Sequence, residues 1–162
     1  MPYEPRLTRD LRDLLATQRV AALGTLGDDG MPFVSMVPYA VEPRSPCLVI
    51  HVSELAAHTR NLRATPRVSL MVMRAEVAGE PVHALPRVTL EGHAMVLQPG
   101  SAAWAHGRAV YLARFPESLP MTQLDDFMFV AIQISGARQI AGFGAARSLD
   151  ADEMDVILRP LM

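Results

Sequence analysis

The chain has 162 residues, half of them hydrophobic and a fifth charged, so its length and composition are those of one domain with a sizeable core. Fifteen basic and seventeen acidic side chains give a formal net charge of -2, which argues against a nucleic-acid-binding protein. No apolar run is long enough to span a membrane, no N-terminal segment is typical of a signal peptide, and a lone cysteine excludes an internal disulfide. We therefore expect one cytoplasmic domain over residues 1–162, with neither nucleic acid nor a membrane as its partner.

The first forty residues predict a short helix followed by a β-hairpin. Four leucines have the spacing of one helix face, with Thr8 as a candidate N-cap: Leu7, Leu11, Leu14 and Leu15. The apolar segment 20–26 predicts a strand, Gly27-Asp-Asp-Gly30 predicts a turn, and segment 32–41 predicts the returning strand. We expect the helix to cover one end of the sheet that this hairpin begins.

The next segment combines a buried strand with a candidate anion site. The apolar run Leu48–Val52 predicts a strand, which leads directly into a helix over 53–64 that Thr65-Pro66 ends. Ser53 is the expected N-cap, and the free N–H groups of a first helical turn attract anions. Side chains that can also donate to a phosphate are Ser53, His58, Thr59 and Arg60. The alternative is a capped surface helix whose polar groups are solvated.

The remaining elements are predicted from alternating apolar residues and from helix signals. Gly92 interrupts one strand and indicates a β-bulge or a close backbone approach, and Ser135-Gly136 is the expected turn of a late hairpin. Asp150-Ala-Asp-Glu153 resembles a capping box before a last short helix. The other expected elements are strands over 67–74, 88–97, 127–134 and 138–143, a helix over 101–115, and loops over 75–86 and 116–126.

Strands joined by short turns, with helices at only a few crossovers, favour an antiparallel barrel with peripheral helices. A doubly wound parallel sheet would need a helix between nearly every pair of strands. Gly142 and Gly144 do not form a dinucleotide-binding fingerprint, because Arg147 stands where the third glycine is required. The expected fold class is therefore mainly β (α+β), with six to seven antiparallel strands.

Five segments together carry a resemblance to a known family: Val20–Thr25, Gly30–Tyr39, His51–Leu70, Arg87–Gly92 and Ala137–Leu149. In this order they resemble the flavin-binding split-barrel family typified by pyridoxamine 5'-phosphate oxidase. Within that family the chain is similar to the branch of bacterial heme-utilisation (HugZ-like) proteins. The resemblance implies a split β-barrel and a homodimer, with FMN bound in sites at the subunit interface.

Carried over by position, the resemblance also implies a set of cofactor-binding residues. The set comprises Ser35, Met36, Val37, Pro38 and Tyr39 along the isoalloxazine and ribityl chain, His51, Val52 and Ser53 at the end of a strand, His58 and Thr59 at the phosphate, Arg87 at the ring, and Phe143, with Arg138 nearby, reaching the flavin of the other subunit. No catalytic residue and no metal ligand is assigned.

Three departures from the oxidase remove positive charge. Ala57-His58 stands where the oxidase has an Arg-Lys pair, Ser35 replaces an arginine and Ala40 replaces a lysine. The chain contains no lysine, so arginine, histidine and backbone N–H groups must bind any phosphate. These departures argue against oxidation of pyridoxamine phosphate itself.

The resulting prediction is an FMN-binding flavoprotein, an oxidoreductase that acts on a small molecule. Two alternatives remain open: a heme-binding or heme-degrading protein on the same barrel, and a non-catalytic flavin-binding module. In the heme alternative the axial ligand is one of three histidines whose spacing matches no common metal site: His83, His93 and His106.

Overall fold

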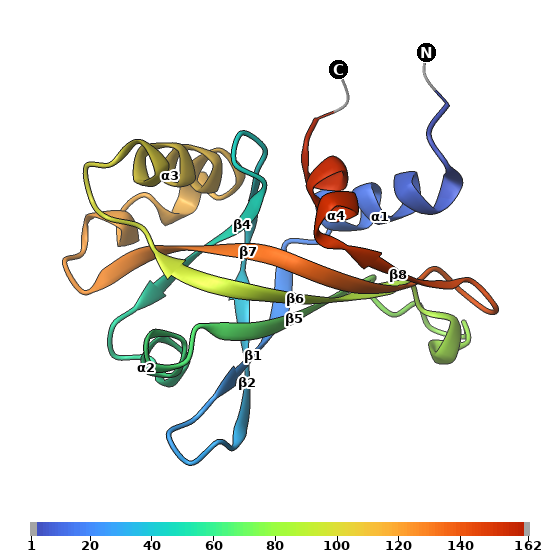
Figure 1. Ribbon diagram of the computed structural model, residues 1–162, viewed down its shortest axis with the longest axis horizontal. Coiled ribbons are helices and arrows are strands. Elements are labelled where there is room, and N and C mark those ends of the chain that lie inside the picture. The colour runs from blue at the N-terminus through green and yellow to red at the C-terminus, as the bar shows by residue number, and fades with distance from the viewer. Residues whose placement is uncertain (1–2, 161–162) are drawn as a thin grey trace.

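The computed structural model describes residues 3–160, in which eight strands form one antiparallel sheet that curls into a half-barrel (Figure 1). The strands are paired in the order β2-β1-β5-β6-β7-β4-β3, and β8 is added to β7. The mainly β split-barrel prediction is confirmed. The strand bounds are β1 Val20–Leu26, β2 Pro32–Pro38, β3 Ala40–Glu42, β4 Cys47–Ser53, β5 Arg67–Met73, β6 Arg87–Val96, β7 Phe127–Ile140 and β8 Ala146–Asp150.

Helices lie around the sheet rather than between its strands. In Figure 1, α1 and α4 lie side by side near one end of the sheet, α3 covers the other end, and α2 lies beyond the start of β5. Within the described residues no helix has both the length and the apolar character needed to cross a membrane. The helix bounds are α1 Arg6–Thr17, α2 Ala57–Ala64, α3 Ala102–Arg114 and α4 Ala151–Leu158, with 3-10 turns η1 Val82–Ala84, η2 Pro116–Ser118 and η3 Met121–Gln123.

Alternation along the strands gives the sheet a buried inner face and an exposed outer face. In β1 the side chains of Ala21, Leu23 and Thr25 are buried, and the residues between them are more exposed. The inner face packs against the leucines of α1 and against α4. A second core lies between α3 and strands β3, β4 and β7, so β4 is buried along nearly its whole length.

Tyr39 joins the sheet to the first helix. Its ring is fully buried, and its hydroxyl donates a hydrogen bond to the carbonyl of Leu15 over 2.9 Å. Here the predicted strand 32–41 divides into β2 and β3, which pair with different neighbours. The division lets the chain pass from one side of the half-barrel to the other.

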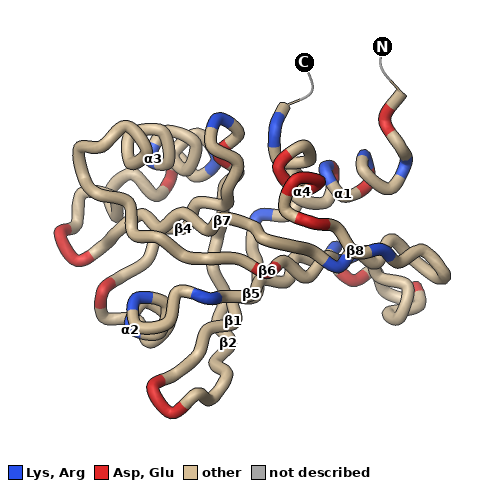
Figure 2. Tube along the Cα trace, in the orientation of Figure 1, with Lys and Arg blue, Asp and Glu red and all other residues tan. Residues whose placement is uncertain are grey.

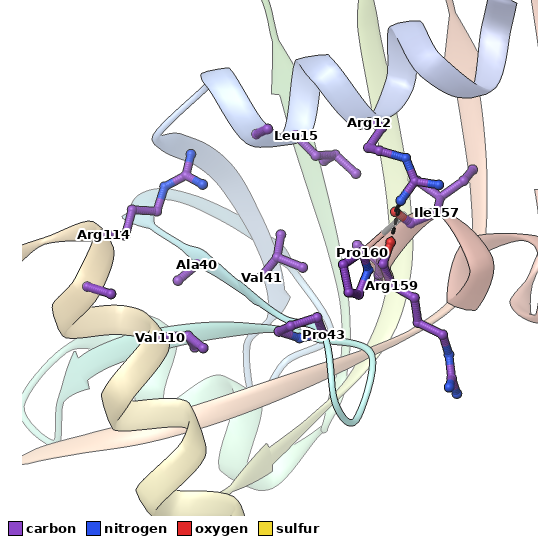
Figure 3. Close-up of a pocket in the computed structure, with 13 residues that line it drawn as sticks. Arg12, Leu15, Ala40, Val41, Pro43, Val110, Arg114, Ile157, Arg159 and Pro160 are labelled. Atoms are coloured by element: carbon purple, nitrogen blue, oxygen red, sulfur yellow. Dashed lines mark hydrogen bonds between the residues drawn. The ribbon is translucent and has the colours of Figure 1, made fainter. Parts of the chain in front are cut away.

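Arg12 joins α1 to α4. Its guanidinium donates to the carbonyls of Ile157 and Arg159 (Figure 3). It also pairs with Glu4 at 3.0 Å. Beside it a groove of about 520 Å³ opens between α1, α3 and α4. This groove contains none of the residues that the sequence assigns to a cofactor.

The prediction of a late hairpin around Ser135-Gly136 is wrong, because β7 runs without interruption through both residues. Ser135 is the extra residue of a β-bulge: Glu91 pairs with Gly136, and Gly92 already pairs with Ile134. The predicted irregularity at Gly92 is therefore confirmed. A Cβ at Gly92 would lie only 2.7 Å from the carbonyl oxygen of Gln133, so a side chain does not fit there.

The real hairpin follows β7 at residues 141–145 and leads into β8. Gly142 and Gly144 have φ angles of 132° and 70°, in the region that favours glycine, so these two glycines are explained by a turn.

Two predicted helix caps are also wrong, and one is confirmed. Pro5, not Thr8, precedes α1, and no side chain caps that helix. The second helix begins at Ala57 rather than at Ser53, and the Ser53 hydroxyl instead accepts the N–H of Leu55 at 3.2 Å. Asp150 forms the expected capping box at the start of α4.

Candidate cofactor-binding face

The outer face of the sheet brings together side chains from five neighbouring strands. Met36 of β2 is paired with Ala22 of β1, which is paired in turn with Met71 of β5. The row continues through Thr89 of β6 to Arg138 of β7. Paired side chains project from the same side of a sheet, so this row crosses one surface. We call that surface the outer face: Val20, Ala22, Gly24, Leu26, Val34, Met36, Arg67, Ser69, Met71, Met73, Arg87, Thr89, Glu91, His93 and Arg138.

The part of the outer face on β1 and β2 is apolar and exposed. Val34 and Met36 are 69% and 63% exposed, and neither strand carries a charged residue along its length (Figure 2). Exposed apolar side chains that are contiguous indicate a surface for a ligand or for another protein chain.

A hollow of about 510 Å³ lies on the outer face where β1, β5 and β6 meet, and we call it the outer hollow. Gly24 lines it, and a Cβ on Gly24 would meet nothing nearer than the carbonyl oxygen of Ser69 at 3.5 Å. Arg67 and His93 are paired across β5 and β6 in its wall, and both are exposed. With Glu91 beside them, the hollow offers an imidazole, a guanidinium and a carboxylate next to an apolar surface.

Ser35 points away from the outer face, towards α2. Its hydroxyl lies 2.9 Å from Nδ1 of His58, a hydrogen bond between β2 and the first turn of α2. Partial burial lowers the pKa of His58, so the imidazole is neutral at pH 7. The next strand and the same helix are joined by the amide of Asn61, which donates to the hydroxyl of Thr25 at 3.0 Å.

The predicted phosphate anchor is only partly assembled in this chain. Thr59 is fully buried, and its hydroxyl has no hydrogen-bond partner among the described residues. The backbone N–H groups of Thr59 and Arg60 are directed to the carbonyl of Ala56. The side chains of the first turn that remain for an anion are the exposed guanidinium of Arg60 and the neutral imidazole of His58.

The other predicted residues of β2 and β4 are divided between core and surface. Val37, Tyr39 and Val52 are buried in the main core, whereas Met36 lies on the outer face and Pro38 is partly exposed. These side chains therefore do not line one continuous surface.

His51 lies in a cluster of aromatic rings. Its ring centroid is 4.4 Å from that of Phe129, 5.1 Å from that of Phe127 and 5.7 Å from that of Tyr111. Burial lowers its pKa from 6.5 to about 4, so the imidazole is neutral. This environment is that of a packed core residue.

Arg87, Arg138 and Phe143 lie towards the opposite end of the sheet from α2. Arg87 donates to the carbonyl of Leu85 at 2.9 Å, and Arg138 donates to the hydroxyl of Ser148 at 3.2 Å. Both arginines belong to the outer face. Phe143 is 73% exposed in the β7–β8 turn, so its ring is available to another molecule.

Apart from His93, a candidate axial ligand in the heme alternative, the residues of the outer hollow were not assigned to a site from the sequence. Alternation along segments 67–73 and 87–93 places Arg67, Ser69, Glu91 and His93 on one side, which is the signal that would have found them. Gly24 carries no such signal, because its place in the hollow depends on the space between the side chains of the neighbouring strands. Among the described residues no group of three or more His, Cys, Asp or Glu side chains is placed to bind a metal ion by itself.

Comparison with known proteins adds independent findings. The sequence profile described as Pyridoxamine 5'-phosphate oxidase matches residues 7–141. A Vibrio cholerae protein named heme oxygenase HutZ is 29% identical over 150 residues, which cover 92% of this chain and 84% of that protein. A chloroplast heme oxygenase of Arabidopsis thaliana, HOZ, is 34% identical over 119 residues, 73% of this chain but only 34% of that protein.

A solved structure supports the same relationship. The heme binding protein from Mycobacterium smegmatis superposes with a TM-score of 0.84 at 27% identity, over 96% of this chain and 62% of that one. The matched residues contain the strands of the outer face and the elements that carry the Ser35–His58 hydrogen bond. The chain therefore belongs to the pyridoxamine 5'-phosphate oxidase family.

Proposed function

We propose that this protein binds heme on the outer face of its sheet and does so as a homodimer. The observation that carries the proposal is the outer hollow, where the exposed imidazole of His93 and the guanidinium of Arg67 adjoin the apolar side chains of Leu26 on β1 and Pro32 on β2. The relatives named for heme support the choice of ligand.

The residues present fit the chemistry of heme. A porphyrin needs an apolar surface, a ligand for its iron and cations for its two carboxylates. Leu26 and Met71 supply apolar surface, His93 supplies a nitrogen ligand, and Arg67 supplies a cation. When bound, heme supplies an iron centre able to bind and activate O₂, and the protein's own groups position it and limit the access of water.

The exposed apolar side chains of β1 and β2 support the homodimer. Closed two-fold assemblies are the commonest soluble oligomers, and their interfaces are more apolar than the rest of the surface. In such a dimer Phe143 would contact the partner's cofactor. The outer hollow, open on one side in a single protomer, would become enclosed.

A hemin titration followed by absorption spectroscopy tests the proposal. The wild-type protein should give a Soret band that saturates at one heme per chain, and His93→Ala should lower the affinity about tenfold or more. His83→Ala is the matched control, because His83 is exposed in η1 and lies off the outer face. Equal titrations of the two variants would remove His93 from the site, and no Soret band would overturn heme binding.

Degradation of the bound heme is the corresponding enzymatic proposal. With O₂ and an electron donor added, the Soret band of the complex should decline faster than that of free hemin under the same conditions. A stable Soret band would instead indicate a protein that stores or transfers heme.

FMN remains the second candidate, and the Ser35–His58 hydrogen bond beside Arg60 is the observation that favours it. These groups lie where the family resemblance puts the phosphate, although the hydroxyl of Thr59 is enclosed and His58 is neutral. A yellow protein with flavin absorbance as purified, or saturable quenching of FMN fluorescence, would support this candidate over heme.

A further inference from the structure

A second groove lies between α3 and the strands beneath it, away from the Ser35–His58 hydrogen bond. It has a volume of about 400 Å³, within the usual range for small-molecule sites. We call it the α3 groove; its lining includes Glu42, Cys47, Met95, Leu97, His106 and Gln133. Cys47 begins β4, whereas Ser53 ends the same strand near α2, so the groove and the predicted phosphate anchor lie at opposite ends of β4.

Glu42 is the unusual residue of this groove. Its side chain is only 4% exposed, yet it forms no ion pair among the described residues. One carboxylate oxygen, Oε1, accepts the backbone N–H of Arg44 at 2.8 Å. The other, Oε2, is buried without a hydrogen-bond partner. A buried carboxylate oxygen with no donor is costly, and buried charges are normally paired.

No cationic side chain pairs with Glu42 in the part of the chain that the structure describes. No arginine lines the α3 groove, and the chain has no lysine. Burial and the nearby Glu42 carboxylate raise the pKa of the Cys47 thiol to about 12, so this neighbour stays neutral. The rest of the lining is mostly apolar. Its further polar groups are the hydroxyl of Ser45, the imidazoles of His93 and His106, and the amide of Gln133.

We propose that the α3 groove binds a small organic cation, a protonated amine or amidinium on an apolar body, with its N–H groups donating to Glu42. The terminal torsion of a glutamate rotates easily, so Oε2 can turn towards such a ligand. The apolar lining accommodates the body of the ligand. An anion is disfavoured, because it would meet the Glu42 carboxylate without a compensating cation.

His93 lines both the α3 groove and the outer hollow, so the test leaves it unchanged. Glu42 and Ala103 line the α3 groove but do not belong to the outer face.

The test uses three ligands of similar size, each titrated calorimetrically against the full-length protein: benzamidine, benzyl alcohol and benzoate. The wild-type protein should bind benzamidine with a dissociation constant near or below about 1 mM, at least about tenfold more tightly than the alcohol, and should not bind benzoate. Equal affinity for the three ligands, or no benzamidine binding, would overturn the proposal.

Two variants place the ligand in the groove. Glu42→Gln keeps the volume and an acceptor for the N–H of Arg44, and it should weaken benzamidine binding at least about tenfold without affecting benzyl alcohol. Ala103→Phe adds a ring at an exposed position of α3 that lines the groove, and should block both ligands.

Thermal unfolding checks that each variant is folded. If Glu42→Gln does not fold, Ala103→Phe still decides the outcome. Unchanged benzamidine binding in a folded Ala103→Phe variant would refute the assignment to this groove.

Discussion

The hydroxyl of Ser35 and Nδ1 of His58 are 2.9 Å apart, which ties the edge strand β2 to the first turn of α2. Within residues 3–160 this hydrogen bond is one of two polar links between the β1–β2 hairpin and α2, the other being Asn61 to Thr25. Ser35, which replaces an arginine of the oxidase, is thus hydrogen-bonded to His58, which stands at the predicted phosphate position. The two residues that depart from the oxidase pattern are therefore in direct contact.

Loss of this hydrogen bond should destabilise the protein. Ser35→Ala leaves the partly buried Nδ1 of His58 without its partner, and we expect the free energy of unfolding to fall by about 1 kcal/mol, measured with urea. Ser148→Ala is the control, because it removes an exposed hydrogen bond to Arg138 and should change stability by less than about 0.5 kcal/mol. Equal effects of both substitutions would contradict the structural role of the Ser35–His58 contact.

His51 should make stability depend on pH. Because burial holds its pKa near 4 in the folded protein against 6.5 when exposed, the unfolded chain binds a proton first as the pH falls. Stability should therefore decrease from about pH 6.5 to about pH 4, and the two pKa values limit this loss to ~3 kcal/mol. Below about pH 4 the contribution of His51 should no longer change.

The measurement compares unfolding free energies of wild type and His51→Leu across this pH range. The variant keeps His58, whose pKa is also lowered, so the difference between the two proteins isolates His51. The Tyr111 ring beside it has a pKa raised to about 12 by burial and by Glu117, and does not titrate here. Parallel pH profiles would show that His51 carries no such linkage.

Two glycines on strands β1 and β6, which lie on either side of β5, should respond differently to substitution. Gly24→Val places a side chain in the outer hollow with only ordinary contacts, so stability should change by less than about 1 kcal/mol while hemin affinity falls at least about tenfold. Gly92→Ala forces a Cβ to within 2.7 Å of a backbone oxygen and should cost about 2 kcal/mol or more. Urea unfolding and hemin titration of both variants measure this contrast, and unchanged hemin affinity in Gly24→Val would exclude the hollow.

The homodimer should depend on the apolar part of the outer face. Met36→Asp puts a carboxylate at the centre of that surface, and light scattering after size exclusion should then report a monomer at concentrations where the wild type is a dimer. Leu119→Asp alters an exposed apolar residue off this face and should remain dimeric. A monomeric wild-type protein would refute the proposed assembly.

Local sequence signals were enough for most of the fold. The strand over 20–26, the helix over 101–115, the bulge at Gly92 and the capping box at Asp150 are all confirmed, because each depends on residues close together in the chain. The turn at Ser135-Gly136 was misread. Those residues are typical of a hairpin turn, but pairing with β6 and β8 holds them in a continuous strand.

The site was harder to predict for a related reason. Alternation in β2 and the change of direction at Tyr39 send Ser35, Met36 and Tyr39 to different surroundings, although they are close in sequence. Arg67 and His93 come together only through the register of β5 and β6. Buried polar atoms that lack a partner, such as Oε2 of Glu42, likewise have no signature in the sequence, because the missing partner is a property of the packed chain.

Strand β2 lies at the edge of the sheet and both begins and ends with proline, at Pro32 and Pro38. Proline has no N–H to donate, and it interrupts the regular backbone ladder that an incoming strand would need. We therefore expect the exposed Val34 and Met36 not to start amyloid-like strand addition at this edge. Another molecule is expected to contact their side chains rather than the β2 backbone. The β1–β2 hairpin can thus expose an apolar face for binding, while the prolines of its edge strand oppose aggregation through strand pairing.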